Sequence, residues 1–203
     1  EKTMSNSHLM DPRPLILGST STYRAELLRR LGLPFTSVSP SVDETPMTSE
    51  PPQALALRLA LAKAQAVAKC HPEAIVIGSD QVADLHGQPL GKPGTEARAV
   101  AQLQAMRGQT VMFHTAVSVV CEALSFAKTE LAVIKVKFRD LSDDEIKRYV
   151  AVEQPLDCAG SAKSEGLGIS LLAHIRNDDP TALIGLPLIR TCQLLREVGL
   201  MTP

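Results

Sequence analysis

The stretch AIVIGSDQV, residues 74–82, decides the fold class that the sequence predicts. Four apolar residues followed by Gly78 and Ser79 predict a buried strand that ends there and places Asp80 at the edge of a sheet. Open α/β sheets carry their functional residues at such strand ends. Many buried strands also end in an aspartate that only caps a turn, so this stretch alone leaves both roles of Asp80 open.

Composition limits the classes of protein to consider. The length of 203 residues and the hydrophobic content of 44% predict one core, either undivided or split by a cleft into two lobes. The formal net charge is -1, so no general field attracts nucleic acid or anionic lipid, and a bound polyanion needs a local cluster of cations. Aromatic residues make up 3% of the chain and Trp is absent, which argues against a stacking platform for single-stranded nucleic acid.

The termini, the cysteines and the hydropathy bear on domain limits and localisation. Residues 1–13 are polar and lack the apolar segment of a signal peptide, so they are interpreted as a disordered leader or as residues foreign to the natural chain. Residues 14–203 are then one domain with two lobes. The four cysteines lack the close pairs of a zinc or redox site, and no apolar run approaches the roughly 20 residues that span a bilayer. These features predict a soluble, cytoplasmic protein that does not contact a membrane.

The segment after the first predicted strand has the composition of an anion site. Residues 14–18 form the strand, Ser19 and Ser21 lie in a small polar turn, and Arg24 lies in the first turn of a helix that ends at Gly32. Backbone N–H groups at a helix start, serine hydroxyls and a guanidinium can bind a phosphate. Ser21 taken alone is explained more simply as the N-cap of the helix, but Arg24 in the same turn makes a phosphate site a competitive interpretation. No Gly-Lys-Ser/Thr sequence is present, which excludes a P-loop.

A long helix predicted over residues 51–70 carries a lysine where an apolar residue is expected. Lys63 interrupts a nearly apolar row, in which a charge needs a partner. Either Lys63 faces a ligand or its stem snorkels to solvent, and the pattern does not decide between the two. Lys69, near the end of the helix, needs no partner. Upstream, Asp43 and Glu44 follow a short strand and either bind a divalent metal or belong to a solvated loop, which is the simpler interpretation of these two residues alone.

The rest of the chain alternates β-rich segments with three shorter helices and one glycine-rich loop. Periodicity, turn signals and a capping box predict a hairpin tip at 82–90, a helix at 96–107, strands at 111–121 and 131–138, a helix from 142 to about 152, a strand at 169–175 and a helix at 187–198. Residues 158–168 include three glycines that let the backbone approach a ligand closely. Glu165 in this loop is either an acceptor for that ligand or a solvated carboxylate.

Taken in order, these motifs resemble the Maf family of nucleoside triphosphate pyrophosphatases. The resemblance runs from about residue 14 to about residue 199 and is carried by Ser19-Thr20-Ser21 with Arg24, Val42-Asp43-Glu44, Lys63 in its helix, Ser79-Asp80-Gln81, Gly91-Lys92-Pro93 and Gly185-Leu186-Pro187. It implies an α/β fold like that of inosine triphosphate pyrophosphatases, with an elongated, twisted mixed sheet flanked by helices and two lobes around a nucleotide-binding cleft. It also implies cleavage between the α- and β-phosphates of a nucleotide, and family members often form homodimers.

The residue types fit this chemistry. Asp80 matches the family's catalytic base, which orients and deprotonates the attacking water. Glu44 and Asp80 are the expected protein ligands of a divalent cation, Mg²⁺ or Mn²⁺, whose other ligands are phosphate oxygens. Three cations and two hydroxyls are expected to bind the phosphates: Arg24, Lys63, Lys92, Ser19 and Ser21.

Three further residues resemble the subfamily that acts on 7-methyl-GTP. Tyr23, Gln81 and Glu165 match the positions that mark substrate specificity there, although position 23 is usually Trp. An aromatic face attracts the cationic methylated base by about 0.5–2 kcal/mol, and a carboxylate accepts both the N1–H and the amine of guanine. Members that act on dTTP or UTP instead have Thr after the catalytic Asp and Ile-Gln-Gly in the late glycine stretch, and they are the alternative. A non-catalytic nucleotide-binding regulator of septum formation is the other hypothesis.

Overall fold

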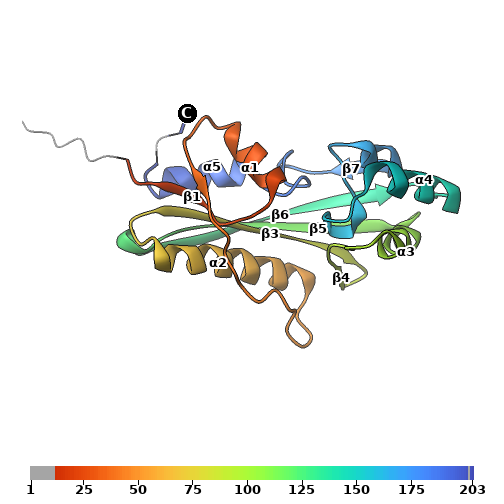
Figure 1. Ribbon diagram of the computed structural model, residues 1–203, viewed down its shortest axis with the longest axis horizontal. Coiled ribbons are helices and arrows are strands. Elements are labelled where there is room, and N and C mark those ends of the chain that lie inside the picture. The colour runs from red at the N-terminus through yellow and green to blue at the C-terminus, as the bar shows by residue number, and fades with distance from the viewer. Residues whose placement is uncertain (1–11, 201) are drawn as a thin grey trace, which may run out of the picture.

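The computed structural model describes residues 12–200, 202 and 203, which form an open mixed sheet flanked by helices (Figure 1). The sheet order is β2-β1-β3-β5-β6-β7, and β4 pairs with β3. In chain order the elements are β1 (Leu15–Leu17), α1 (Thr22–Arg29), β2 (Thr36–Ser37), α2 (Pro52–Cys70), β3 (Ile75–Leu85), β4 (Gln88–Leu90), α3 (Glu96–Met106), β5 (Thr110–Cys121), η1 (Glu122–Leu124), β6 (Phe126–Phe138), α4 (Asp143–Glu153), η2 (Ala159–Ser161), η3 (Leu167–Leu171), β7 (Leu172–Arg176) and α5 (Leu188–Glu197). The predicted α/β class and mixed sheet are confirmed. The leader predicted over residues 1–13 falls mostly on residues 1–11, which lie outside the described residues.

Three long antiparallel strands, β3, β5 and β6, form the spine of the sheet. On its other edge β3 has two short partners: β1 runs parallel to residues 75–77, and β4 runs antiparallel to residues 83–85. Between them, residues 78–82 have no strand partner on this edge within the described chain. The gap leaves the middle of β3 without a neighbouring strand on this edge, although its residues are mostly buried.

The close approach of α2 explains the glycine in β3. A Cβ on Gly78 would lie 2.4 Å from the carbonyl oxygen of Ala60 and 2.5 Å from the nitrogen of Ala64, so only glycine lets α2 pack this tightly on the strand. The prediction that the strand ends at Gly78 and Ser79 is therefore wrong: Gly78 makes room for α2, and the hydroxyl of Ser79 donates to the carbonyl oxygens of Ala116 and Gly185. β3 continues to Leu85, and Asp80 lies within the strand.

Each face of the sheet has its own helices (Figure 1). α2 covers one face, where its apolar side chains pack with Val82 and Ala116. On the opposite face α1 and α5 pack in a cluster with Ile77 near one end, and α3 and α4 pack in a second cluster with Phe113 near the other end. The two clusters are separated along β3, and Gln81 lies between them. One two-lobed domain over residues 14–203 stays a prediction.

The remaining predicted elements differ from the structure mainly at their ends. Ser142 and Glu145 form the predicted capping box of α4, and the hairpin turns at His86 and Gly87 between β3 and β4. β6 begins at Phe126, before the predicted strand, and the strand predicted over 169–175 begins only at Leu172 because η3 precedes it. In the part of the chain that the structure describes, every helix is too short or too polar to cross a membrane.

Candidate active site

A cavity of about 630 Å³ borders the uncovered part of β3. Its walls come from the start of α1, the loop before α2, α2 itself, β3, the segment after β4 and the loop after α4. The structure brings nine of the ten predicted site residues to this cavity: Ser21, Tyr23, Arg24, Glu44, Lys63, Asp80, Gln81, Lys92 and Glu165. Ser19 is outside the cavity lining; it is buried, and its Oγ accepts a hydrogen bond from the N–H of Ser21 at 3.1 Å.

Asp80 and Gln81 reach the same cavity from opposite faces of the sheet. Successive side chains of a strand point to opposite faces, so Asp80 lies on the α2 side and Gln81 on the other. Both can contribute because, among the described residues, no strand pairs with this part of β3 on its outer edge. The cavity therefore has one end near α2 and another near α1 and the loop after α4, which is the arrangement that an elongated ligand needs.

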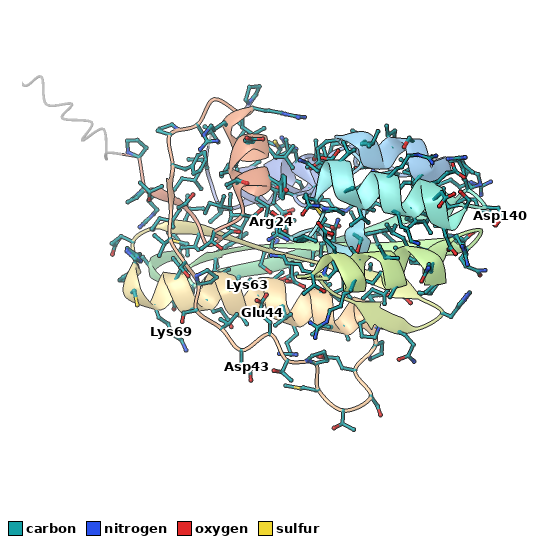
Figure 2. The ribbon with its side chains drawn as sticks, turned by 45° about the vertical axis from the view of Figure 1, so that its right-hand side comes forward. Arg24, Asp43, Glu44, Lys63, Lys69 and Asp140 are labelled. Atoms are coloured by element: carbon teal, nitrogen blue, oxygen red, sulfur yellow. The ribbon has the colours of Figure 1, made fainter. Side chains whose placement is uncertain are left out.

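The end near α2 contains a lysine between two carboxylates. Lys63 Nζ lies 2.8 Å from Asp80 Oδ1 and 2.5 Å from Glu44 Oε1. Lys63 and Asp80 are only 8% and 7% exposed, so Lys63 does not snorkel to solvent, and its ligand-facing role stays a prediction. Figure 2 shows Arg24, Lys63 and Glu44 gathered in one region, whereas Lys69 lies elsewhere on α2.

Burial and charge act in opposite directions on these carboxyl groups. Burial raises the pKa of Asp80 above the ordinary aspartate value, and the ammonium of Lys63 offsets only part of this rise. For Glu44, partial burial is outweighed by the hydrogen bond and charge of Lys63, so its pKa is lowered. A base becomes more effective as its pKa moves toward the operating pH, so Asp80 is the better base of the two and Glu44 the more stable anion.

Arg24 is held so that the end of its guanidinium is left for a ligand. Its Nε donates to the carbonyl oxygen of Gly185 at 2.8 Å, and within the described residues neither terminal nitrogen has a hydrogen-bond partner. Burial lowers the pKa of Arg24, and the charges of Asp80 and Glu44 oppose this effect. The hydroxyl of Ser21 accepts from the N–H of Arg24 at 3.3 Å, so Ser21 is the N-cap of α1 as well as a cavity residue.

The other end of the cavity contains the three residues expected to read a base. Tyr23 donates its hydroxyl proton to Asp157 Oδ1 at 3.0 Å. Gln81 donates from Nε2 to the hydroxyl of Thr115 and to backbone oxygens, which leaves its amide oxygen as the group for a ligand. Burial raises the pKa of Glu165. Lys92 lines the same cavity from the segment after β4.

Sequence reasoning missed Asp157. This residue lines the cavity and accepts a hydrogen bond from Tyr23, although the two residues are 134 positions apart in the sequence. It lies one residue before the glycine-rich stretch that begins at Cys158, and no spacing in the sequence connects it to α1. Only the tertiary contact with Tyr23 identifies it.

The carboxylates fit a hard cation that takes further ligands from its substrate. Mg²⁺ is typically held by one or two carboxylates together with phosphate oxygens and waters, and Glu44 and Asp80 provide two carboxylates that both contact the ammonium of Lys63. In the described part of the chain, no cluster of three or more His, Cys, Asp or Glu residues forms a complete metal cage. The residues therefore fit a metal that arrives with a nucleotide better than one held by the protein alone.

The fold and the site define an α/β protein with a cation-lined cleft and a buried aspartate beside a lysine, a combination suited to hydrolysis of phosphate anhydrides. Residues 14–198 match the family model of Maf-like proteins, so the chain belongs to this family.

Several relatives are similar over nearly the whole chain, and each of the following is named 7-methyl-GTP pyrophosphatase. A protein from a Polaromonas species is 66% identical over 187 residues, which cover 92% of this chain and 85% of that protein. One from Albidiferax ferrireducens is 62% identical over 93% of this chain and 94% of its own length. One from Aromatoleum aromaticum is 59% identical over 93% of this chain and 97% of its own length.

Proposed function

We propose that this protein is a nucleotide pyrophosphatase that hydrolyses 7-methyl-GTP to 7-methyl-GMP and pyrophosphate. The observation that carries the proposal is a single cavity with Asp80, Lys63 and Glu44 at one end and Tyr23 and Glu165 at the other. The three relatives described above, which are 59%, 62% and 66% identical to this chain, are named 7-methyl-GTP pyrophosphatase. The activity would remove a modified nucleotide from the cellular pool.

Asp80 acts as the general base in the proposed reaction. Its carboxylate accepts a proton from the attacking water, for which the pKa raised by burial is favourable. Lys63 uses two of its three N–H bonds on Asp80 and Glu44, so one remains for a phosphate oxygen. Arg24 supplies its terminal nitrogens, and Lys92 a further charge, to the oxygens on which negative charge develops.

Glu44 and Asp80 would hold a divalent cation, Mg²⁺ or Mn²⁺. Bound there with the triphosphate, such an ion neutralises charge on the phosphate oxygens. The two carboxylates keep Lys63 between them in the free protein. Lys63 therefore offsets one of the two negative charges before substrate and metal arrive.

Tyr23 and Glu165 would select the base. The ring of Tyr23 attracts the positive charge of 7-methylguanine, a contribution of about 0.5–2 kcal/mol. Glu165 accepts from the N1–H and the amine of guanine, whereas uracil and thymine offer only one such N–H. The amide oxygen of Gln81 completes the polar contacts from the opposite wall of the sheet.

The test is a comparison of kcat/KM for 7-methyl-GTP, GTP, dTTP, UTP and CTP, each with Mg²⁺ and with Mn²⁺. The highest value is expected for 7-methyl-GTP, and Glu165→Gln should lower that value selectively. A preference for dTTP or UTP would assign the protein to the alternative substrate class. No turnover of any nucleotide, together with cellular function retained in Asp80→Asn, would favour the regulator. Light scattering tests the homodimer implied by the resemblance.

A further inference from the structure

A hydrogen bond joins the two walls of the cavity at its base-reading end. Tyr23 lies in the first turn of α1 and Asp157 in the loop after α4, and the Tyr23 hydroxyl donates to Asp157 Oδ1 at 3.0 Å. The pKa of Tyr23 is raised, first by burial and then by the neighbouring acidic groups, so the phenol stays neutral and keeps donating. One oxygen of Asp157 therefore orients the ring, and its carboxylate lies at the cavity wall.

The charge of Asp157 is not balanced by a cation. In the part of the chain that the structure describes, no Lys or Arg forms an ion pair with it. The ammonium of Lys163 lies 5.6 Å from the centre of the Tyr23 ring but is paired with Glu153 Oε1 at 3.1 Å. This pairing raises the pKa of Lys163, and Glu153 shares its charge. Within the described residues, Asp157 thus places a carboxylate without an ion-pair partner beside the aromatic ring of Tyr23.

The two ends of the cavity therefore differ in sign. Arg24, Lys63 and Lys92 outnumber Glu44 and Asp80 at the phosphate end. At the other end the lining residues Asp157 and Glu165 are both acidic, and the nearby Lys163 is paired with Glu153. A ligand with anionic phosphates and a cationic base complements this cavity, because each end of the ligand faces charge of the opposite sign. An ordinary guanine nucleotide has anionic phosphates but a neutral base.

We infer that Asp157 is a specificity-determining residue that favours a positively charged base over a neutral one through its uncompensated carboxylate beside Tyr23. The inference rests on the proposed function and deepens it. Glu165 reads the hydrogen-bonding edge that guanine and 7-methylguanine share, so it separates guanine from pyrimidines. Asp157 responds to the charge that only the methylated base carries, so it separates 7-methyl-GTP from GTP.

Two substitutions separate the charge of Asp157 from its hydrogen bond. Asp157→Asn keeps an oxygen that accepts from the Tyr23 hydroxyl and removes only the charge. Tyr23→Phe keeps the ring and the charge and removes only the hydrogen bond. Asp140→Asn is the matched control, since Asp140 is an exposed carboxylate far from the cavity (Figure 2).

The measurement is kcat/KM for 7-methyl-GTP and for GTP with each variant, at low and at high salt. In Asp157→Asn the ratio of the two values is expected to fall about 3- to 10-fold, the effect of one partly screened charge. The change should lie in KM for 7-methyl-GTP, with kcat and the values for GTP unchanged within about two-fold, because ground-state binding is lost. High salt should shrink the difference between wild type and Asp157→Asn. Tyr23→Phe should retain a higher ratio than Asp157→Asn.

Three outcomes would overturn the inference. An equal loss for both nucleotides in Asp157→Asn would mean that the residue only positions Tyr23. An unchanged ratio in Asp157→Asn, with the wild type preferring 7-methyl-GTP, would remove the role of Asp157 and leave the proposed function intact. A wild type that does not prefer 7-methyl-GTP would refute the proposed function itself, and the inference with it.

Discussion

Replacing Lys63 by Met removes one charge from the centre of the site while keeping most of the length of the side chain. Lys63 and Asp80 are 8% and 7% exposed and lie 2.8 Å apart. Removing one member of a buried ion pair costs about 3–5 kcal/mol, because the other charge stays buried without its partner. Arg24 still faces Asp80 in the variant, so we expect the lower end of this range, about 3 kcal/mol of unfolding free energy at pH 8.

The loss should depend on pH in a defined direction. Burial already raises the pKa of Asp80, and without Lys63 the pKa rises further. A group whose pKa is higher in the folded than in the unfolded state stabilises the fold below its unfolded pKa, and this contribution is lost as the pH rises through the folded pKa. The cost of Lys63→Met should therefore be smaller at pH 5, where Asp80 can take up a proton, than at pH 8.

Urea unfolding at pH 5 and pH 8 measures both quantities. Lys69→Met is the control, since Lys69 lies on the same helix but is exposed (Figure 2), and it should change stability by no more than about 0.5 kcal/mol. Activity of Lys63→Met should fall at least about 100-fold, as for loss of one transition-state donor. A cost for Lys63→Met no greater than that for Lys69→Met, or a cost equal at the two pH values, would refute the compensation of Asp80 by Lys63.

Three other predictions test the metal, the base and the packing of the strand. Glu44→Gln should raise the Mg²⁺ concentration for half-maximal activity by about 10- to 100-fold, whereas Asp43→Asn should leave it unchanged; equal effects would argue against Glu44 as a ligand. A profile of kcat/KM against pH should fall on the acid side as Asp80 takes up a proton, at a pH above the ordinary aspartate range, and a midpoint within that range would contradict the raised pKa. Gly78→Ala should cost about 3 kcal/mol in thermal or urea unfolding, because its Cβ would meet backbone at 2.4 Å, while Gly91→Ala, with no atom within 4 Å, should cost under about 1 kcal/mol; equal costs would contradict the tight packing of α2.

Local signals predicted the elements that depend on local chemistry. The helix over residues 51–70 follows from its period and its proline start, and α2 spans Pro52–Cys70. The capping box at Ser142 and Glu145 is formed by neighbouring residues, so the sequence alone contains it. The site residues were predicted from their types and their order, which resemble those of a known family. The structure places nine of the ten at one cavity.

Features that depend on tertiary packing could not be predicted from the sequence. Gly78 and Ser79 looked like a strand end, and only the approach of α2 shows that the glycine makes room for a helix. The sequence did not decide whether Lys63 faces a ligand or solvent, because its partners come from a strand and a loop outside its own helix. No local pattern indicated a role for Asp157, because its partner Tyr23 is 134 positions away in the sequence.

The most direct test of the proposed function is to identify the products from 7-methyl-GTP with Mg²⁺ for the wild type, Asp80→Asn and Asp140→Asn. We expect one pyrophosphate for each 7-methyl-GMP from the wild type and from Asp140→Asn, and a loss of about 100- to 10,000-fold in Asp80→Asn, the usual contribution of a general base. Stability of Asp80→Asn should not fall at pH 8, because the burial that raises the pKa of Asp80 disfavours its charged form. Orthophosphate as the released product, or an Asp80→Asn variant as active as the wild type, would contradict the proposed function.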